Sequence, residues 1–149
     1  MMNKPNIFMF AKKELSQDAF IAWLVSWASP ELNEEDQPLN ETAQQFVRLL
    51  LGFNEQFEIL KIKVRLQWKN IDICVEVNDE CFVLVEDKTN TGEHSDQLVR
   101  YRKTADDFFG RKDYSVHCVY LKPGNEPANS LDKIISKGYR IVSRQCLLS

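Results

Sequence analysis

The sequence predicts an α/β fold in which helices flank a mixed sheet, and three observations lead to this prediction. Two segments near the N-terminus carry apolar residues at helical spacing. Three short segments between residues 60 and 88 then show strand patterns separated by turn residues, which predicts an antiparallel meander. Beyond them, helical and strand-like segments alternate, so a helical crossover returns the chain to the same sheet. The predicted order is α-α-β-β-β-α-β-α-β.

The first two helices are predicted over residues 16–28 and 41–51. In the first, Phe20 and the tryptophans that follow recur at positions i, i+3 and i+7. Ser16 is a plausible N-cap of this helix, and Pro30 stops it. The second helix is expected to end near Gly52. The acidic, proline-containing residues 29–40 between them are predicted to be a connector.

The three strands of the meander are predicted over residues 60–68, 71–77 and 81–88. The first alternates apolar residues with Lys61, Lys63 and Arg65, which predicts a half-buried strand with a basic outer face. The remaining elements are a helix over 95–109, a strand over 114–121, a short helix over 131–136 and a strand over 139–143. The buried stripe of the long helix is expected at Leu98, Tyr101, Ala105 and Phe108.

The composition indicates an ordinary globular protein. The 149 residues suit a single domain over residues 1–149, and 44% of them are hydrophobic. No apolar run is long enough for a membrane helix, and the N-terminus lacks a signal-peptide layout. The four cysteines are widely spaced, which favours reduced thiols and a cytoplasmic location over zinc or disulfides. The net charge of −3 means that nucleic-acid binding would rest on a local basic surface or on a metal ion.

The residues that carry chemistry are predicted on the second and third strands. Side chains alternate along a strand, so Glu86 and Lys88 share one face. The position of Asp72 depends on the hairpin register. A two-residue loop would place Asp72 on the opposite face, whereas a three-residue loop over 78–80 places it opposite Glu86. The second register also gathers the valines on one apolar face, and we therefore predict it.

Two carboxylates placed directly opposite each other repel, unless a cation binds them or one pKa rises. Oxygen ligands with open positions suit Mg²⁺ or Mn²⁺, which keep several waters and meet substrate phosphates. Lys88, on the same face, could orient the attacking water or neutralise the phosphate. The alternative for Glu86 and Lys88 is a salt bridge at the edge of the sheet.

In these features the sequence resembles the PD-(D/E)xK nuclease superfamily. The counterparts of its motif are Asp72 on the second strand and Glu86-Asp87-Lys88 on the third, and Ile71 stands where the family name has proline. The resemblance implies a three-layer α-β-α restriction-endonuclease-like core with a central mixed sheet. It also implies Mg²⁺-dependent hydrolysis of DNA phosphodiesters, in which the acids hold the metal and the lysine assists the nucleophilic water.

Two further features are similar to motifs of the same superfamily. Gln97 and Tyr101 form a Q-x-x-x-Y pattern, as in RecB-type nucleases, and their spacing places both on one helix face. The alternative is a core tyrosine beside a chance glutamine. Glu14 precedes the first helix and is the candidate for the additional metal ligand that many members have. Its alternative role is to complement the helix dipole.

The predicted function is therefore a metal-dependent nuclease that acts on DNA. Asp72 and Glu86 are the expected metal ligands, Glu14 a third, and Lys88, Gln97 and Tyr101 the other catalytic positions. The alternatives are a catalytically inactive interaction module with the nuclease fold, and a fragment of a larger nuclease. The apolar residues 7–10 could cover a partner protein or a second copy of the chain, or pack on their own core.

Overall fold

The computed structural model describes residues 5, 17–69, 71–87, 95–122 and 128–143. Within them the elements follow the predicted order, and two short 3₁₀ turns over Pro30–Leu32 and Gly110–Lys112 lie between them. The helices are α1 (Gln17–Ser26), α2 (Gln37–Leu51), α3 (Ser95–Phe109) and α4 (Ala128–Ser136). The strands are β1 (Ile62–Trp68), β2 (Ile71–Val77), β3 (Cys81–Asp87), β4 (Ser115–Lys122) and β5 (Tyr139–Ser143).

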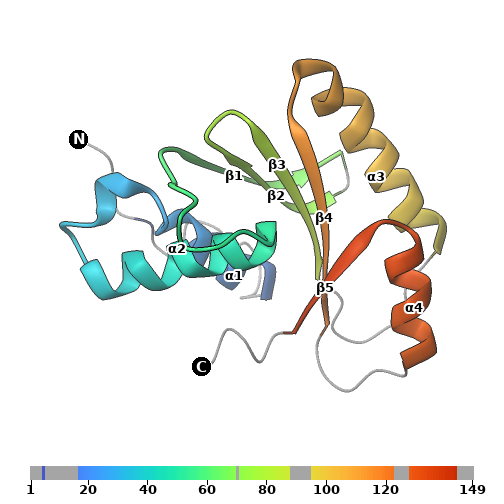
Figure 1. The fold of residues 1–149 in the computed structure, drawn as a ribbon, viewed down its shortest axis with the longest axis horizontal. Helices are drawn as coiled ribbons and strands as arrows, with labels where there is room; N and C mark the ends of the chain where they lie inside the picture. The colour runs from blue at the N-terminus through green and yellow to red at the C-terminus, as the bar shows by residue number, and fades with distance from the viewer. Residues whose placement is uncertain (1–4, 6–16, 70, 88–94, 123–127, 144–149) are drawn as a thin grey trace.

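The five strands form one mixed sheet in the order β1-β2-β3-β4-β5. The pairs β1–β2 and β2–β3 are antiparallel, as short turns allow, whereas β3–β4 and β4–β5 are parallel. The helices α3 and α4 make the two crossovers that parallel pairing requires (Figure 1). The prediction of a meander followed by helical crossovers is confirmed, and β3 lies at the centre of the sheet.

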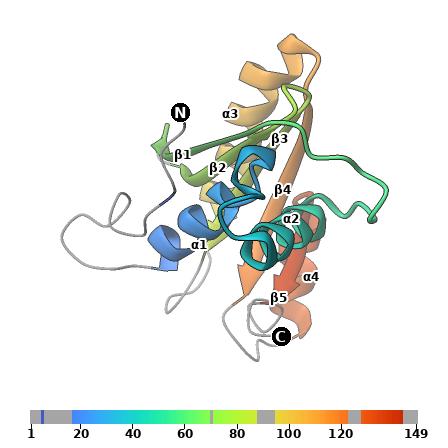
Figure 2. The ribbon, with the colours of Figure 1, turned by 90° about the vertical axis from the view of Figure 1, so that its left-hand side faces the viewer.

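Helices cover both faces of the sheet, which confirms the predicted three-layer α-β-α architecture. On one face, α1 and α2 pack against Ile73, Val75 and Val83, and Figure 2 shows these two helices in front of the strands. On the other face, α3 and α4 pack against Phe82 and Leu84. Both faces of the central strand are therefore buried. None of the described helices is long and apolar enough to cross a membrane.

The helix α2 begins earlier than predicted, at Gln37 instead of residue 41. The side chain of Asp36 accepts a hydrogen bond from the backbone N–H of Leu39 and so caps the helix. Pro38 lies in the first turn, where its missing N–H costs nothing. Part of the predicted connector is therefore the first turn of α2. The sequence signal for this earlier start is Asp36 as the N-cap, followed by Pro38.

The β2–β3 hairpin has the predicted three-residue loop. Val77 pairs with Cys81, Val75 with Val83, and Ile73 with Val85. Asn78 and Asp79 take positive φ angles of 58° and 55°, which Asn and Asp tolerate better than most residues. The Asn78 side chain also accepts hydrogen bonds from the backbone N–H groups of residues 60 and 61, and so ties the loop to the start of β1.

Two aromatic residues pack differently from the predicted patterns. Strict alternation places Trp68 on the same face as Leu66, but Gln67 has a φ of 57° and Trp68 packs on the α3 side against Phe82. On α3 the buried residue near the C-terminus is Phe109, which is 2% exposed, whereas Phe108 is 37% exposed. Phe109 stacks on Phe82 with ring centroids 3.9 Å apart, so this contact selects the buried ring.

The thiols of Cys74, Cys81 and Cys118 are free and buried. Burial raises the pKa of Cys74 and of Cys118 from 9.0 to about 12. Between these values the unfolded chain loses thiol protons that the folded chain keeps. We therefore expect the free energy of unfolding to fall by about 1.4 kcal/mol per pH unit for each thiol as the pH rises through this range.

The measurement is chemical denaturation at several pH values between about 9 and 12, compared with the variant Cys74→Ala/Cys118→Ala. The variant should lose stability less steeply with pH, whatever its absolute stability. Equal slopes for the two proteins would show that the buried thiols do not keep their protons.

Candidate active site

A row of polar side chains crosses the sheet at one level. Glu86 of β3 pairs with Tyr120 of β4. The observed β2–β3 pairs end at Ile73–Val85, and continuing this register by one residue would bring Asp72 opposite Glu86. On the other side of Asp72, the Gln67 side chain of β1 donates a long hydrogen bond of 3.4 Å to its carboxylate. The facing positions of the two carboxylates remain a prediction.

This row becomes more buried from the edge of the sheet to its centre. Gln67 is exposed and Asp72 is half-buried. Glu86 and Tyr120 are only 1% and 2% exposed. The row is therefore open to solvent on the β1 side and closed on the β4 side. The alternative, a salt bridge between Glu86 and Lys88, involves a lysine that lies outside the described residues.

The helix α3 lies over the same face of the sheet as Glu86. Its Leu98 and Ala105 belong to the core cluster that contains Leu84 and Tyr120, and Tyr101 packs against this cluster. Gln97 is half-buried, and its Oε1 atom is buried without a hydrogen-bond partner among the described residues. The structure thus brings the helix with the Q-x-x-x-Y pattern to the carboxylate face.

Tyr139 of β5 connects this helix to the sheet, and the sequence patterns did not single it out. Its hydroxyl donates a buried hydrogen bond of 2.7 Å to the carbonyl oxygen of Leu98. Burial raises the pKa of Tyr139, and the nearby charges of Cys118, Glu86 and Tyr101 raise it further. Tyr139 therefore lies within electrostatic range of both Glu86 and Tyr101. The only feature of the sequence that points to Tyr139 is its place as an aromatic residue at the start of a strand, directly after Gly138.

Two predicted site residues, Glu14 and Lys88, lie outside the described residues. The basic face predicted on the first strand is partly neutralised. Lys61 pairs with Asp79, and the Arg65 guanidinium lies 3.2 Å from Glu76.

Glu76 of β2 is, like Glu86 of β3, a buried carboxylate, and its surroundings are those of a structural residue. It is 8% exposed and accepts a hydrogen bond from the Tyr114 hydroxyl, besides its ion pair with Arg65. It pairs with Phe82, four residues from Glu86 along β3. Glu76 is therefore a natural control for substitutions at Glu86, because its charge is balanced by an arginine of the same sheet.

The chemistry of Asp72 and Glu86 fits a divalent metal ion. An ionised carboxylate as buried as Glu86 is costly unless a positive charge compensates it. Within the described part of the chain, no group of three His, Cys, Asp or Glu side chains lies where it could hold a metal ion. Mg²⁺ can be bound by only one or two carboxylates and keeps several waters.

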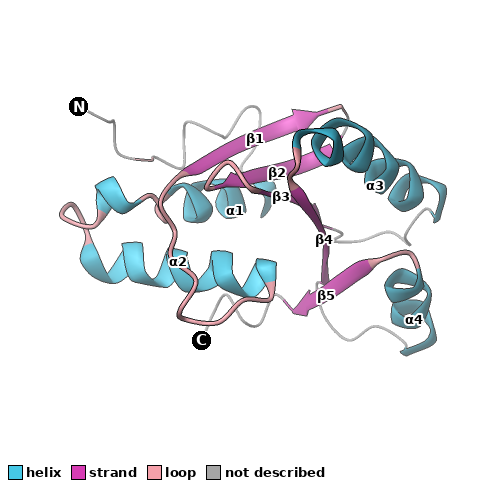
Figure 3. Cartoon of the chain, turned by 45° about the horizontal axis from the view of Figure 1, so that its top comes forward, coloured by secondary structure: helices cyan, strands magenta, loops and turns pink. Residues whose placement is uncertain are grey.

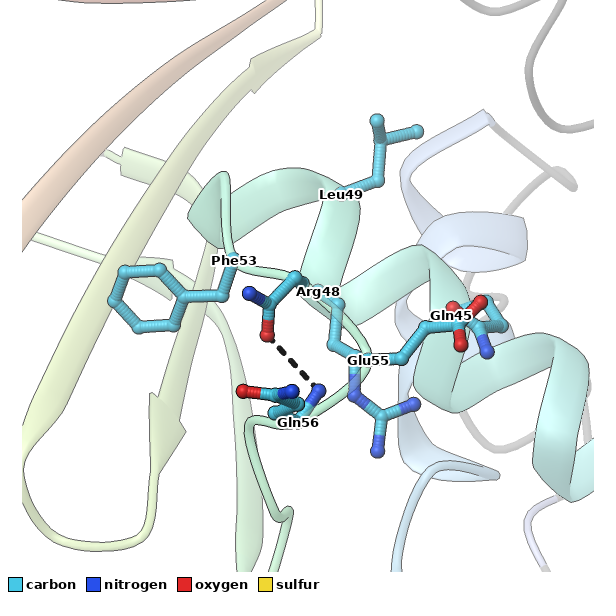
Figure 4. A pocket seen from close by; sticks show the side chains of 7 residues that line it. Gln45, Arg48, Leu49, Phe53, Glu55 and Gln56 are labelled. Atoms are coloured by element: carbon cyan, nitrogen blue, oxygen red, sulfur yellow. Dashed lines mark hydrogen bonds between the residues drawn. The ribbon is translucent and has the colours of Figure 1, made fainter.

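A separate surface pocket of about 540 Å³ lies beyond the C-terminal end of α2 (Figure 4). Arg48 donates a hydrogen bond from Nε to the carbonyl of Phe57, and the side chain of Asn54 accepts one from the backbone N–H of Gln56. The pocket is lined by Gln45, Arg48, Leu49, Phe53, Asn54, Glu55 and Gln56. None of them belongs to β2 or β3, so the pocket is distinct from the carboxylate row.

Comparison with known proteins gives one match. The family model of the PD-(D/E)XK nuclease superfamily matches residues 5–143. No curated protein and no solved structure matches the chain. The match spans all five strands and all four helices described above, and their arrangement is consistent with a restriction-endonuclease-like fold. The chain belongs to the PD-(D/E)XK nuclease superfamily.

Proposed function

We propose that this chain is a metal-dependent nuclease that hydrolyses phosphodiester bonds of DNA at the carboxylate row. The observation that supports this most strongly is the burial of Glu86 in the central strand, together with a β2–β3 register that would bring Asp72 opposite it if continued by one residue beyond Ile73–Val85. Family membership supports the same chemistry. Since both helical layers pack on one sheet, we also propose that residues 1–149 form a single domain.

In this proposal Asp72 and Glu86 hold Mg²⁺ or Mn²⁺, with Glu14 as a further ligand. When bound, the ion supplies Lewis-acid activation of the attacking water and of the phosphate. Asp72, as the more exposed of the two carboxylates, faces the side from which substrate enters. Glu86, held in the central strand, has little freedom to move, which favours a defined coordination geometry.

Lys88 follows Glu86 by two positions, and we propose that its ammonium orients the nucleophilic water or neutralises the phosphate. Gln97 and Tyr101 are proposed as positioning residues on α3. The hydrogen bond from Tyr139 to the Leu98 carbonyl supports this, because it fastens that part of the helix to the sheet. The buried Oε1 of Gln97 has hydrogen-bonding capacity left for a water or a substrate group.

The test is cleavage of supercoiled plasmid and of a labelled single strand in the presence of Mg²⁺, Mn²⁺ or EDTA. We expect nicking that needs the metal. Lys88→Ala should lower the rate about a hundredfold, as the loss of one charge-stabilising group does, while Mn²⁺ binding measured by calorimetry stays unchanged. Lys133→Ala on α4 is the control, because it removes an exposed lysine far from β3 in the sequence.

The outcome that contradicts this proposal has two parts. One is the absence of metal-dependent cleavage of either substrate. The other is Mn²⁺ binding that is absent, or that does not change in Asp72→Asn. Together they would leave the inactive interaction module as the better description of this chain.

A further inference from the structure

The end of β1 and the C-terminal end of α3 meet at the surface and form an aromatic patch that carries two lysines. Figure 3 shows these two ends side by side. Trp68 and Lys69 come from the β1 side, and Phe108 and Lys112 come from α3 and the turn after it. We call these four residues the aromatic–lysine platform.

The ring of Phe108 is the exposed centre of the platform. It is 37% exposed, and its centroid lies 5.3 Å from that of Trp68. The Nζ atom of Lys112 lies 4.2 Å from the centroid of the Phe108 ring, and that of Lys69 lies 5.4 Å from it. Phe109, beneath the platform, stacks on Phe82, so the exposed ring rests on a rigid buried cluster.

The two lysines are available to bind an anion. Within the described part of the chain, no carboxylate lies within ion-pair distance of either ammonium group. This distinguishes them from Lys61 and Arg65, which are paired with acids. A base that stacks on Phe108 displaces the lysine ammonium groups from the ring, and these then supply counter-charges for the flanking phosphates.

The platform adjoins the open side of the carboxylate row. Gln67 directly precedes Trp68 in the chain, and its side chain donates to Asp72 at 3.4 Å. The row is exposed at Gln67 and closed at Tyr120. A polynucleotide that reaches Asp72 from the β1 side therefore passes the platform.

We propose that the aromatic–lysine platform binds an unpaired segment of nucleic acid, with one base stacked on Phe108 and adjacent phosphates held by Lys69 and Lys112. This inference rests on the proposed function for the identity of the ligand, and it deepens that function by naming single-stranded substrate. Bases of a duplex are stacked on each other, so only an unpaired base can lie on the ring. The net charge of −3 makes this local geometry, not overall attraction, the source of affinity.

The experiment measures binding, in EDTA, of a fluorescent oligothymidine strand and of a duplex of equal length by anisotropy. We expect the single strand to bind more tightly. Phe108→Leu keeps an apolar side chain but removes the aromatic face, and it should weaken single-strand binding about tenfold. Phe108→Tyr keeps the ring and should restore binding. Urea denaturation of both variants shows whether they are folded.

The lysines are tested by the salt dependence of the same binding. Each phosphate contact of a single strand contributes about 0.7 to the slope of log K against log salt concentration, so Lys69→Gln/Lys112→Gln should reduce the slope by about 1.4. The control Lys103→Gln/Lys133→Gln removes two exposed lysines outside the platform and should change the slope much less.

Any of three results would contradict the proposed role of the platform. These are no oligonucleotide binding by the parent protein, equal affinity of Phe108→Leu and the parent, or equal salt-dependence slopes for the two double lysine variants. Each is separable from failure of the proposed nuclease, because binding is measured without metal and cleavage is not. If the parent cleaves DNA but binds it independently of Phe108, the nuclease proposal stands and the platform proposal fails. If the parent binds the oligonucleotide through Phe108 but does not cleave DNA, the platform proposal stands and the nuclease proposal fails.

Discussion

Replacement of Glu86 by glutamine should abolish metal-dependent cleavage and metal binding together. Glutamine has nearly the same shape, so the central strand keeps its packing, but the negative charge that would hold the ion is gone. Lewis-acid stabilisation by a bound metal is worth several kcal/mol, and its loss should lower the rate about a thousandfold. The measurement is plasmid nicking beside calorimetric titration with Mn²⁺.

Glu86→Gln should also separate a metal-binding role from a structural one. At a hundred times its dissociation constant, a bound ion stabilises the folded state by about 2.7 kcal/mol. The parent should therefore unfold at higher denaturant concentration with Mn²⁺ than with EDTA, whereas Glu86→Gln should show no difference. The comparison is made as the difference between Mn²⁺ and EDTA for each protein, so that any effect of the substitution on the packing of this buried side chain cancels.

Glu76→Gln is the matched control for this substitution. Glu76 is also buried and also faces the α3 side, and its side chain contacts Arg65 and Tyr114. Since Arg65 is 37% exposed, we expect a loss of only about 1–2 kcal/mol of stability, with Mn²⁺ binding retained. If Glu86→Gln were destabilised in the same way and bound Mn²⁺ like the parent, Glu86 would be a structural residue.

The largest effect on stability is expected at Phe82. This residue of β3 is fully buried, stacks on Phe109 at 3.9 Å between centroids and meets Trp68 edge-on at 5.4 Å. Phe82→Ala would leave a cavity between the sheet and α3, and we expect it to cost about 3–5 kcal/mol in urea denaturation. Because α3 also covers the carboxylate row, cleavage should fall as this helix loosens.

Phe53→Ala is the control for the cavity effect. Phe53 lies beside the pocket that follows α2, is 39% exposed, and has only Phe57 and His117 as aromatic neighbours among the described residues. Its truncation should cost less than about 1 kcal/mol. Similar losses at Phe53 and Phe82 would mean that the stack of Phe82 on Phe109 does not hold α3 on the sheet.

Much of this fold could be predicted from local patterns. The strands over residues 71–77 and 139–143 and the helix over 95–109 have the predicted bounds. The hairpin register was also predictable, because a slip by one residue would turn the valines of β2 away from α1 and α2. The predicted facing positions of Asp72 and Glu86 rest on continuing that register by one residue beyond Ile73–Val85.

The sequence by itself therefore determined the order of the elements and the register of the central hairpin. Periodicity and turn chemistry act over a few residues, and these features depend on nothing else. Only the tertiary structure decided that Phe109 and not Phe108 is buried, that Trp68 crosses to the α3 side, and that Tyr139 meets Leu98. Such choices depend on which side chains meet after helices and strands far apart in the chain have packed together.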